Sequence, residues 1–193
     1  MAARDRDAKA DGAGDGGETW LGLRPAAKPL VLAGVVLGLG FGGFFDGIVF
    51  HQILQVHHML SSYPDQGVAT DLRLNVLADG LFHLMTYTFT VIGVVLLFRA
   101  WRHPRVPSAG RTLFGSVTMG WGLFNLVEGL VDHQLLGVHH VWPAGPGSVL
   151  LWDLLYLLWG ALFLAGGYLV VRTDDRAKPT YAGEGEGEPA RAD

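Results

Sequence analysis

Four long apolar stretches dominate the hydrophobic pattern of this 193-residue chain, at residues 30–50, 76–98, 113–131 and 149–171. Each approaches the roughly 20 apolar residues that a membrane-spanning helix needs, and each carries very few charges. The pattern therefore predicts an all-α integral membrane protein, a four-helix bundle whose transmembrane domain covers residues 29–172.

The two ends of the chain have a different composition. Residues 1–28 begin with a run of Asp, Gly, Ala and Arg, and residues 173–193 contain a Gly-Glu repeat at 183–188. Segments of this kind cannot bury enough apolar surface to offset the entropy of ordering the chain. We expect both ends to be disordered cytoplasmic tails.

The overall composition supports a membrane location and restricts the chemistry. Hydrophobic residues make up 50% of the chain and charged residues 17%, against about 25% charged in ordinary soluble domains. The chain has no cysteine, so a metal site must use His, Asp, Glu or water. Nothing resembles a nucleic-acid-binding patch, and the lipid bilayer is the expected partner. A homo-oligomer or a partner protein is left open.

The positions of the basic residues predict the orientation. Of the 14 Lys and Arg residues, all but Arg73 precede the first apolar stretch, follow the fourth, or lie between the second and third. Basic loops remain in the cytoplasm. Both termini should therefore be cytoplasmic, and the connection near residue 65 should lie outside. His103, in the basic connection, is excluded from any outer site.

The first span has small residues on one face. Gly34, Gly38 and Gly42 are spaced by four, a pattern that lets another helix approach closely. We expect this to be the central packing helix. A continuous helix from residue 30 to residue 60 would be about 46 Å long, against a hydrocarbon core of about 30 Å, so its last residues must extend beyond the core or follow a break.

A thirteen-residue segment that ends the first span occurs again at the end of the third, 82 residues later. Residues 46–58 read DGIVFHQILQVHH and residues 128–140 read EGLVDHQLLGVHH, with eight identical positions. A repeat marks a duplicated unit, here two tandem two-helix repeats at about 30–100 and 111–172. Both copies run outward, so a pseudo-two-fold axis along the membrane normal should relate them.

The repeated carboxylate and histidines are ligand types for zinc, iron, manganese or copper. When the four spans are threaded through the membrane, ionisable groups from four separate positions fall near the outer end, where they need one another or a metal. The candidate metal ligands are Asp46, His51, His57, His58, Asp79, His83, Glu128, Asp132, His133, His139 and His140.

A helical wheel separates these candidates. On a straight helix, at about 100° per residue, Asp46 and His57 share one direction, while His51 and His58 share another about 120° away. This favours two related sites, or one two-metal centre, over a single ion. His57 and His139 could equally be interfacial polar groups, and Asp132 and Asp153 could cap helices or orient imidazoles. Ligation is favoured for the histidines deeper in apolar sequence, His51, His83 and His133.

The paired His-Gln-x-Leu-x-Val-His-His motifs resemble the signatures of the DUF2243 family of predicted bacterial membrane proteins. The resemblance covers about residues 30–172. It implies four helices in the bacterial inner (cytoplasmic) membrane and no established activity.

The residues lead to three functional hypotheses, and they leave open whether the protein is an enzyme. The first is a membrane oxidoreductase with a two-metal centre near the extracytoplasmic face, bridged by Glu128 or Asp46, with Tyr87 as a relay. Asp79 and His83 would complete the coordination or transfer protons. A second is a non-catalytic copper or zinc protein for binding, delivery or transport; a third, haem b binding, suits the carboxylates less well. In the first hypothesis the imidazoles come from His51, His58, His133 and His140.

Overall fold

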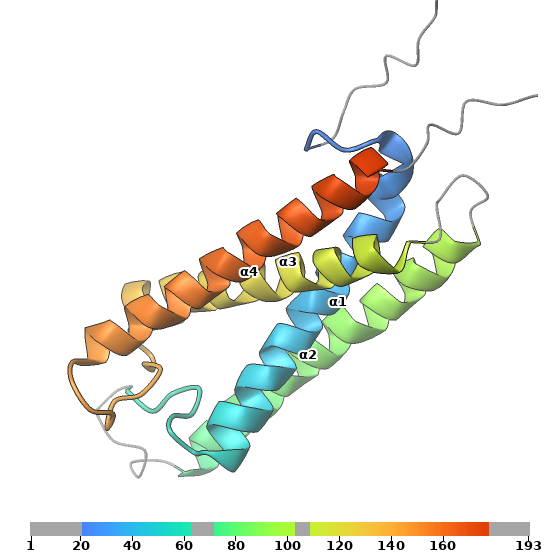
Figure 1. Ribbon diagram of the computed structural model, residues 1–193. Coiled ribbons are helices and arrows are strands. Elements are labelled where there is room, and N and C mark those ends of the chain that lie inside the picture. The colour runs from blue at the N-terminus through green and yellow to red at the C-terminus, as the bar shows by residue number, and fades with distance from the viewer. Residues whose placement is uncertain (1–20, 63–71, 103–108, 178–193) are drawn as a thin grey trace, which may run out of the picture.

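A computed structural model describes residues 21–62, 72–102 and 109–177. In this part of the chain, four long helices form, α1 (Lys28–Phe45), α2 (Leu72–Trp101), α3 (Gly110–Glu128) and α4 (Val149–Ala177). The all-α prediction is confirmed. Successive helices run in opposite directions, so both ends of the described chain lie at one end of the molecule and both motif segments at the other (Figure 1).

Three segments are long and apolar enough to cross a membrane, namely Pro25–Ile53, Leu72–Trp101 and Val149–Asp175. The sequence pattern predicted a fourth, in α3, which is not among them. Helix α3 contains Thr112, Ser116 and Asn125, all of which are buried. Because α3 packs between two other helices, these polar groups are enclosed by protein, and its surface need not match lipid.

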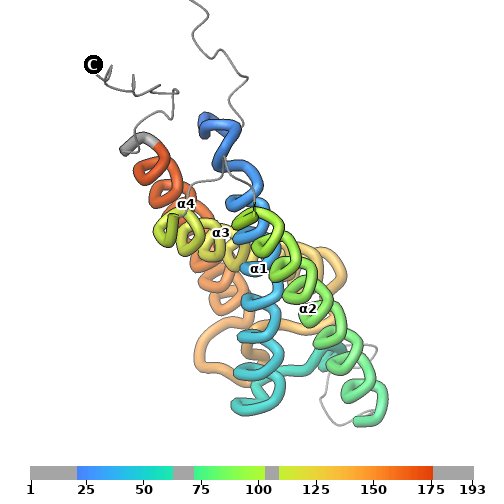
Figure 2. Tube along the Cα trace, turned by 90° about the vertical axis from the view of Figure 1, so that its right-hand side faces the viewer, coloured from blue at the N-terminus to red at the C-terminus, as the bar shows by residue number. Residues whose placement is uncertain are grey.

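The helices follow one another in the order α2, α1, α3, α4 across the molecule (Figure 2). The apolar windows of α2 and α4 are only 17% and 22% buried, against 56% for the span that contains α1. The outer helices thus present apolar side chains such as Leu84, Val94 and Leu162 outward. This distribution is what a lipid-facing surface requires, and it places α1 and α3 at the centre.

Helices α1 and α3 are in backbone contact at two glycines. A Cβ atom on Gly38 would lie 2.1 Å from the carbonyl oxygen of Val117, and one on Gly120 would lie 2.0 Å from the carbonyl oxygen of Val35. The close packing expected of the first span is therefore present. Both residue pairs are equivalent positions of the duplication, so the contact is itself pseudo-symmetric.

The helical domain extends further at both ends than the sequence predicted. Leu23 is buried, and α4 continues to Ala177, past the expected end at residue 172. The two extensions meet, since Nε of Arg24 lies 3.0 Å from Oδ1 of Asp175. Residues 21–28 and 173–177 are therefore part of the packed domain. His103, Asp65 and most of both expected tails lie outside the described residues.

Candidate metal centre

Each motif begins in a π-helix. Helix α1 continues into η2 (Asp46–Ile53) and α3 into η3 (Gly129–Leu135). The backbone then turns at Gln55 and Gly137, whose φ values of 51° and 59° lie in the left-handed region. π-helices are rare and are frequent at functional sites. They also change the rotation per residue, so the straight-helix directions expected from the wheel do not apply beyond Asp46.

This break returns the first histidine of each pair into the protein. The rings of His57 and His139 stack with centroids 4.9 Å apart and planes 14° apart. His51 packs against His57 at 4.7 Å, and His133 packs against His139 at the same distance. All four side chains are 2% exposed or less. The two repeats therefore contribute equivalent histidines to one buried cluster.

One carboxylate from each repeat lies beside these rings. Oδ2 of Asp46 is 3.0 Å from Nε2 of His51, and its Oδ1 is 3.9 Å from Nε2 of His57. Oε1 of Glu128 is 3.6 Å from Nε2 of His139. Both carboxylates are buried. A buried carboxylate is costly unless a cation or a hydrogen-bond donor compensates for it, so the cluster has a strong preference for positive charge.

The two central histidines are oriented by the opposite repeat. Nδ1 of His57 lies 2.7 Å from the carbonyl oxygen of Val141, and Nδ1 of His139 lies 3.1 Å from that of Met59. A carbonyl only accepts, so each Nδ1 carries the hydrogen and donates it. Burial lowers the pKa of His57 below its ordinary value, which keeps the ring neutral. In the neutral form of each ring, Nε2 presents a lone pair, and neither Nε2 has a hydrogen-bond partner.

Asp79, on α2, holds two histidines of the first repeat. Its Oδ1 is 2.9 Å from Nδ1 of His51, and its Oδ2 is 2.7 Å from Nδ1 of His58. The backbone N–H of Met59 also donates to Oδ1, at 2.9 Å. A carboxylate on the second ring nitrogen is the usual partner of a metal-ligating histidine, because it fixes the ring and raises its basicity.

Asp153, on α4, occupies the same place in the second repeat. Its Oδ2 is 2.8 Å from Nδ1 of His140, and its Oδ1 accepts the N–H of Val141 at 3.1 Å. Nδ1 of His133 is 3.7 Å from the same Oδ1. Asp79 and Asp153 are thus equivalent supporting carboxylates, although the sequence placed only Asp79 among the candidate ligands.

Two groups of side chains could hold a metal ion, namely His51 with His57 and His139, and Glu128 with His133 and His139. In each group the ligand atoms lie within 4.8 Å of one another. The two groups share His139, so they are neighbouring parts of one cluster. The structure therefore brings together Asp46, His51, His57, Glu128, His133 and His139 out of the eleven candidates.

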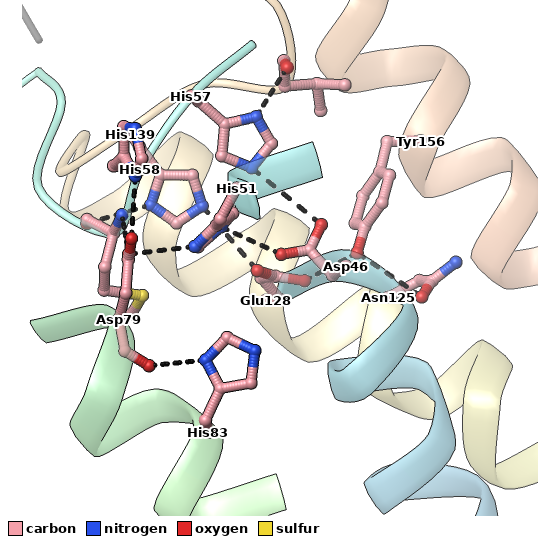
Figure 3. A network of polar contacts seen from close by, with 12 residues as sticks. Asp46, His51, His57, His58, Asp79, His83, Asn125, Glu128, His139 and Tyr156 are labelled. Atoms are coloured by element: carbon pink, nitrogen blue, oxygen red, sulfur yellow. Dashed lines mark hydrogen bonds and ion pairs between the residues drawn. The ribbon is translucent and has the colours of Figure 1, made fainter. Parts of the chain in front are cut away.

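The other candidates lie outside this cluster. His58 and His140 are partly exposed and bond to Asp79 and Asp153, and Asp132 is half-buried outside both groups. His83 lies apart from the other rings (Figure 3), with Nδ1 bonded to the backbone oxygen of Asp79 at 2.7 Å. Tyr87 is 58% exposed on the outer face of α2, so it does not face the cluster, and the relay role that depended on this is not supported.

A different tyrosine contacts the cluster. The hydroxyl of Tyr156 donates to Oε2 of Glu128 at 2.5 Å and lies 3.4 Å from Oδ1 of Asn125 (Figure 3). Tyr156 was missed because the duplication was recognised only in the motif helices. Aligning Asp153 with Asp79 would have aligned α4 with α2 and made Tyr156 the equivalent of Phe82. Phe82 stacks on His51 with ring centroids 5.6 Å apart.

Comparison with known proteins gives a family and no function. The family model described as "Predicted membrane protein (DUF2243)" matches residues 33–174, which include both motifs and all of the cluster residues. No curated protein matches the chain, and no solved structure does. The chemistry therefore has to be inferred from the cluster itself.

Proposed function

The chain belongs to the DUF2243 family of predicted membrane proteins. We propose that it is a membrane oxidoreductase with a resident two-metal centre. Each repeat supplies one half of the centre, made of one carboxylate and two histidines. The first half is Asp46, His51 and His57, and the second is Glu128, His133 and His139.

The observation that carries the proposal is the orientation of the central histidines. Nδ1 of His57 and of His139 is committed to a backbone carbonyl, which leaves Nε2 without a hydrogen-bond partner inside the protein. Nδ1 of His51 is likewise committed to Asp79. Buried polar atoms are nearly always paired. Two cations, one in each half of the cluster, would satisfy these nitrogens and the two carboxylates together.

The burial of the cluster favours a resident ion over one in transit. His51, His57 and His139 are fully buried, so protein would separate an ion held there from solvent. A delivery protein needs ligands that a partner can reach. A haem would need a flat space between two imidazoles, whereas the His57 and His139 rings stack directly at 4.9 Å.

Redox chemistry is the use that this ligand set supports best. Four-helix bundles build di-iron and di-manganese centres from inward-facing carboxylates and histidines. Two carboxylates leave part of the charge of two divalent ions uncompensated, which allows exogenous anionic ligands or bridging oxygens. Tyr156 adds a hydrogen-bonding hydroxyl on Glu128.

The test is metal analysis of the full chain purified in mild detergent, with its optical and electron paramagnetic resonance spectra. We expect two equivalents of iron, manganese or copper. His57→Ala and His139→Ala should each lose most of the bound metal. His83→Ala is the matched control, since His83 is a partly buried histidine at the same end of the molecule whose ring lies outside the cluster.

The outcomes separate the parts of the proposal. Protein that contains no metal under any expression condition, with His57→Ala as stable as the wild type, contradicts the metal centre. Stoichiometric zinc alone supports the centre and contradicts the oxidoreductase, because zinc has no redox chemistry.

A further inference from the structure

A cavity of about 410 Å³ lies between the first motif segment and the second repeat, next to the cluster but separate from it. This volume falls in the range of about 300 to 1,000 Å³ that is usual for small-molecule sites. Five of its nine lining residues are aromatic, and the others are aliphatic. The aromatic ones are Phe50, Trp142, Trp152, Tyr156 and Trp159.

Tyr156 belongs to both the cavity and the cluster. It lines the cavity, its hydroxyl donates to Glu128 at 2.5 Å, and its ring centroid is 5.3 Å from that of His133. A ligand in the cavity would therefore be separated from the cluster by one side chain, and that side chain carries a hydrogen-bonding oxygen.

The aromatic wall is specific to one repeat. The contacts of Asp79 and Asp153 align α2 with α4, and the motifs align the segments that follow. On this alignment, each tryptophan stands where the first repeat has a non-aromatic residue, and the tyrosine stands where it has a phenylalanine. Trp142, Trp152, Tyr156 and Trp159 correspond to Leu60, Ala78, Phe82 and Met85.

This asymmetry indicates a function beyond packing. Packing of the duplicated scaffold is satisfied in the first repeat without these rings, whereas the second repeat concentrates four aromatic side chains around a space that they do not fill. Trp152 is fixed in this wall, because its Nε1 donates to the carbonyl oxygen of Pro146 at 2.9 Å. Trp142 packs against it at 4.9 Å.

The cavity is reached from the lipid side. Two of its lining residues, Leu54 and Leu155, are 56% and 45% exposed, and Leu155 lies on α4, one of the outer, lipid-facing helices. A ligand that enters here must dissolve in the bilayer. Aromatic walls favour a planar ring, which stacks offset or edge-on. The hydroxyl of Tyr156 donates its hydrogen to Glu128, so its oxygen can accept a hydrogen bond from an O–H group on such a ring.

We propose that this cavity binds a lipid-soluble quinone or hydroquinone. Its ring lies among the tryptophans with an oxygen towards Tyr156, and its apolar tail leaves past Leu54 and Leu155. The proposal that the cavity binds this ligand does not depend on the metal centre. The further step, that the ligand is a substrate of the metal centre, rests on the proposed function. A lipid acyl chain is the rival occupant, and it would use neither the planar walls nor the tyrosine oxygen.

The experiment titrates the full chain, in lipid nanodiscs, with decylubiquinone and follows quenching of tryptophan fluorescence, for both metal-loaded and metal-stripped protein. The test variant is Leu155→Trp, which adds a ring at the cavity wall. The matched control is Leu81→Trp, at the equivalent exposed position of the first repeat, which has the same number of tryptophans. Thermal unfolding of both variants shows that they fold.

The wild type and Leu81→Trp should show saturable quenching, and Leu155→Trp should weaken binding by about tenfold or more. Non-saturable quenching, or equal affinity in the two variants, overturns the quinone site. The quinone site is also overturned if lipids with brominated acyl chains quench the tryptophan fluorescence and decylubiquinone does not relieve this quenching. That result would show that an acyl chain occupies the cavity. Binding that persists without metal supports the site even if the metal centre fails, and bound metal without quinone binding contradicts only the site.

Discussion

At the scale of single residues, the cluster depends on which nitrogen of each histidine is free. His57 and His139 are held through Nδ1 by backbone carbonyls, whereas His51 is held by a carboxylate. The same carboxylate, Asp79, also holds His58. Supporting carboxylates of this kind act on metal affinity without touching the metal.

Asp79→Asn and Asp153→Asn should therefore each weaken metal binding by about 10- to 100-fold, because an amide keeps the shape but loses the negative charge that raises imidazole basicity. Affinity is measured by competition with a chelator of known strength. Asp132→Asn is the control, since Asp132 is half-buried outside both ligand groups, and it should leave affinity within about twofold. Equal losses at all three positions would indicate a general charge effect.

The sequence predicted the ligand types at residue level but not all of their roles. The recurrence of Asp46, His51 and His57 as Glu128, His133 and His139 identified the residues that converge. The sequence favoured His58 and His140 as metal ligands. In the structure they bond to Asp79 and Asp153 and lie outside the cluster. Directions computed for a straight α-helix do not hold through a π-helix and a left-handed turn. The length of the first helix left a break open, but it gave neither the type of helix nor the position of the turn.

At the scale of the elements, the site requires α1 and α3 to be in contact, because each carries half of the cluster. The contact is made at Gly38 and Gly120, and its four-residue glycine spacing was readable in the sequence. The polar character of α3 was not expected, because hydropathy describes a helix without its neighbours. Enclosed between α1 and α4, α3 can carry Asn125 and Glu128 at no cost to lipid contact.

Gly38→Ala and Gly120→Ala should each destabilise the protein by about 1 to 3 kcal/mol, since the new methyl overlaps a backbone oxygen that cannot move independently of its helix. The separation of α1 and α3 should also reduce the bound metal. Thermal unfolding in detergent and metal analysis give the two readouts. Gly166→Ala is the matched control in a long helix, because its Cβ would meet nothing within 4 Å; a comparable loss there would refute the contact.

At the scale of the whole molecule, the alternating helix directions place the cluster at one end and the chain ends at the other (Figure 1). The basic residues Arg24, Arg99, Arg102 and Arg111 lie towards the end opposite the cluster. From the positive-inside rule we predict that the cluster lies on the extracytoplasmic side. The aromatic cavity lies at the same end of the molecule as the cluster.

Reporter fusions check this orientation. Fusions after residue 193 and within residues 103–108 should report a cytoplasmic location, and a tag near residue 65 should be accessible from outside intact cells. The reasoning rests on the asymmetry of the 14 Lys and Arg residues. The inverse accessibility pattern would place the cluster at the cytosolic face and change the source of its metal.

The exchange of hydrogen bonds between the repeats bears on the origin of the chain. Val141 orients a histidine of the first half and Met59 orients one of the second, so an isolated half lacks the carbonyl that aims its own ligand. A single two-helix unit would need a second copy of itself to orient this histidine. Chains cut between Arg102 and Ala109 should therefore recover metal when the two pieces are co-expressed, and neither piece should hold it alone. In a single chain the two halves need not be identical, and here a hydroxyl is present at Tyr156 and absent at the equivalent Phe82.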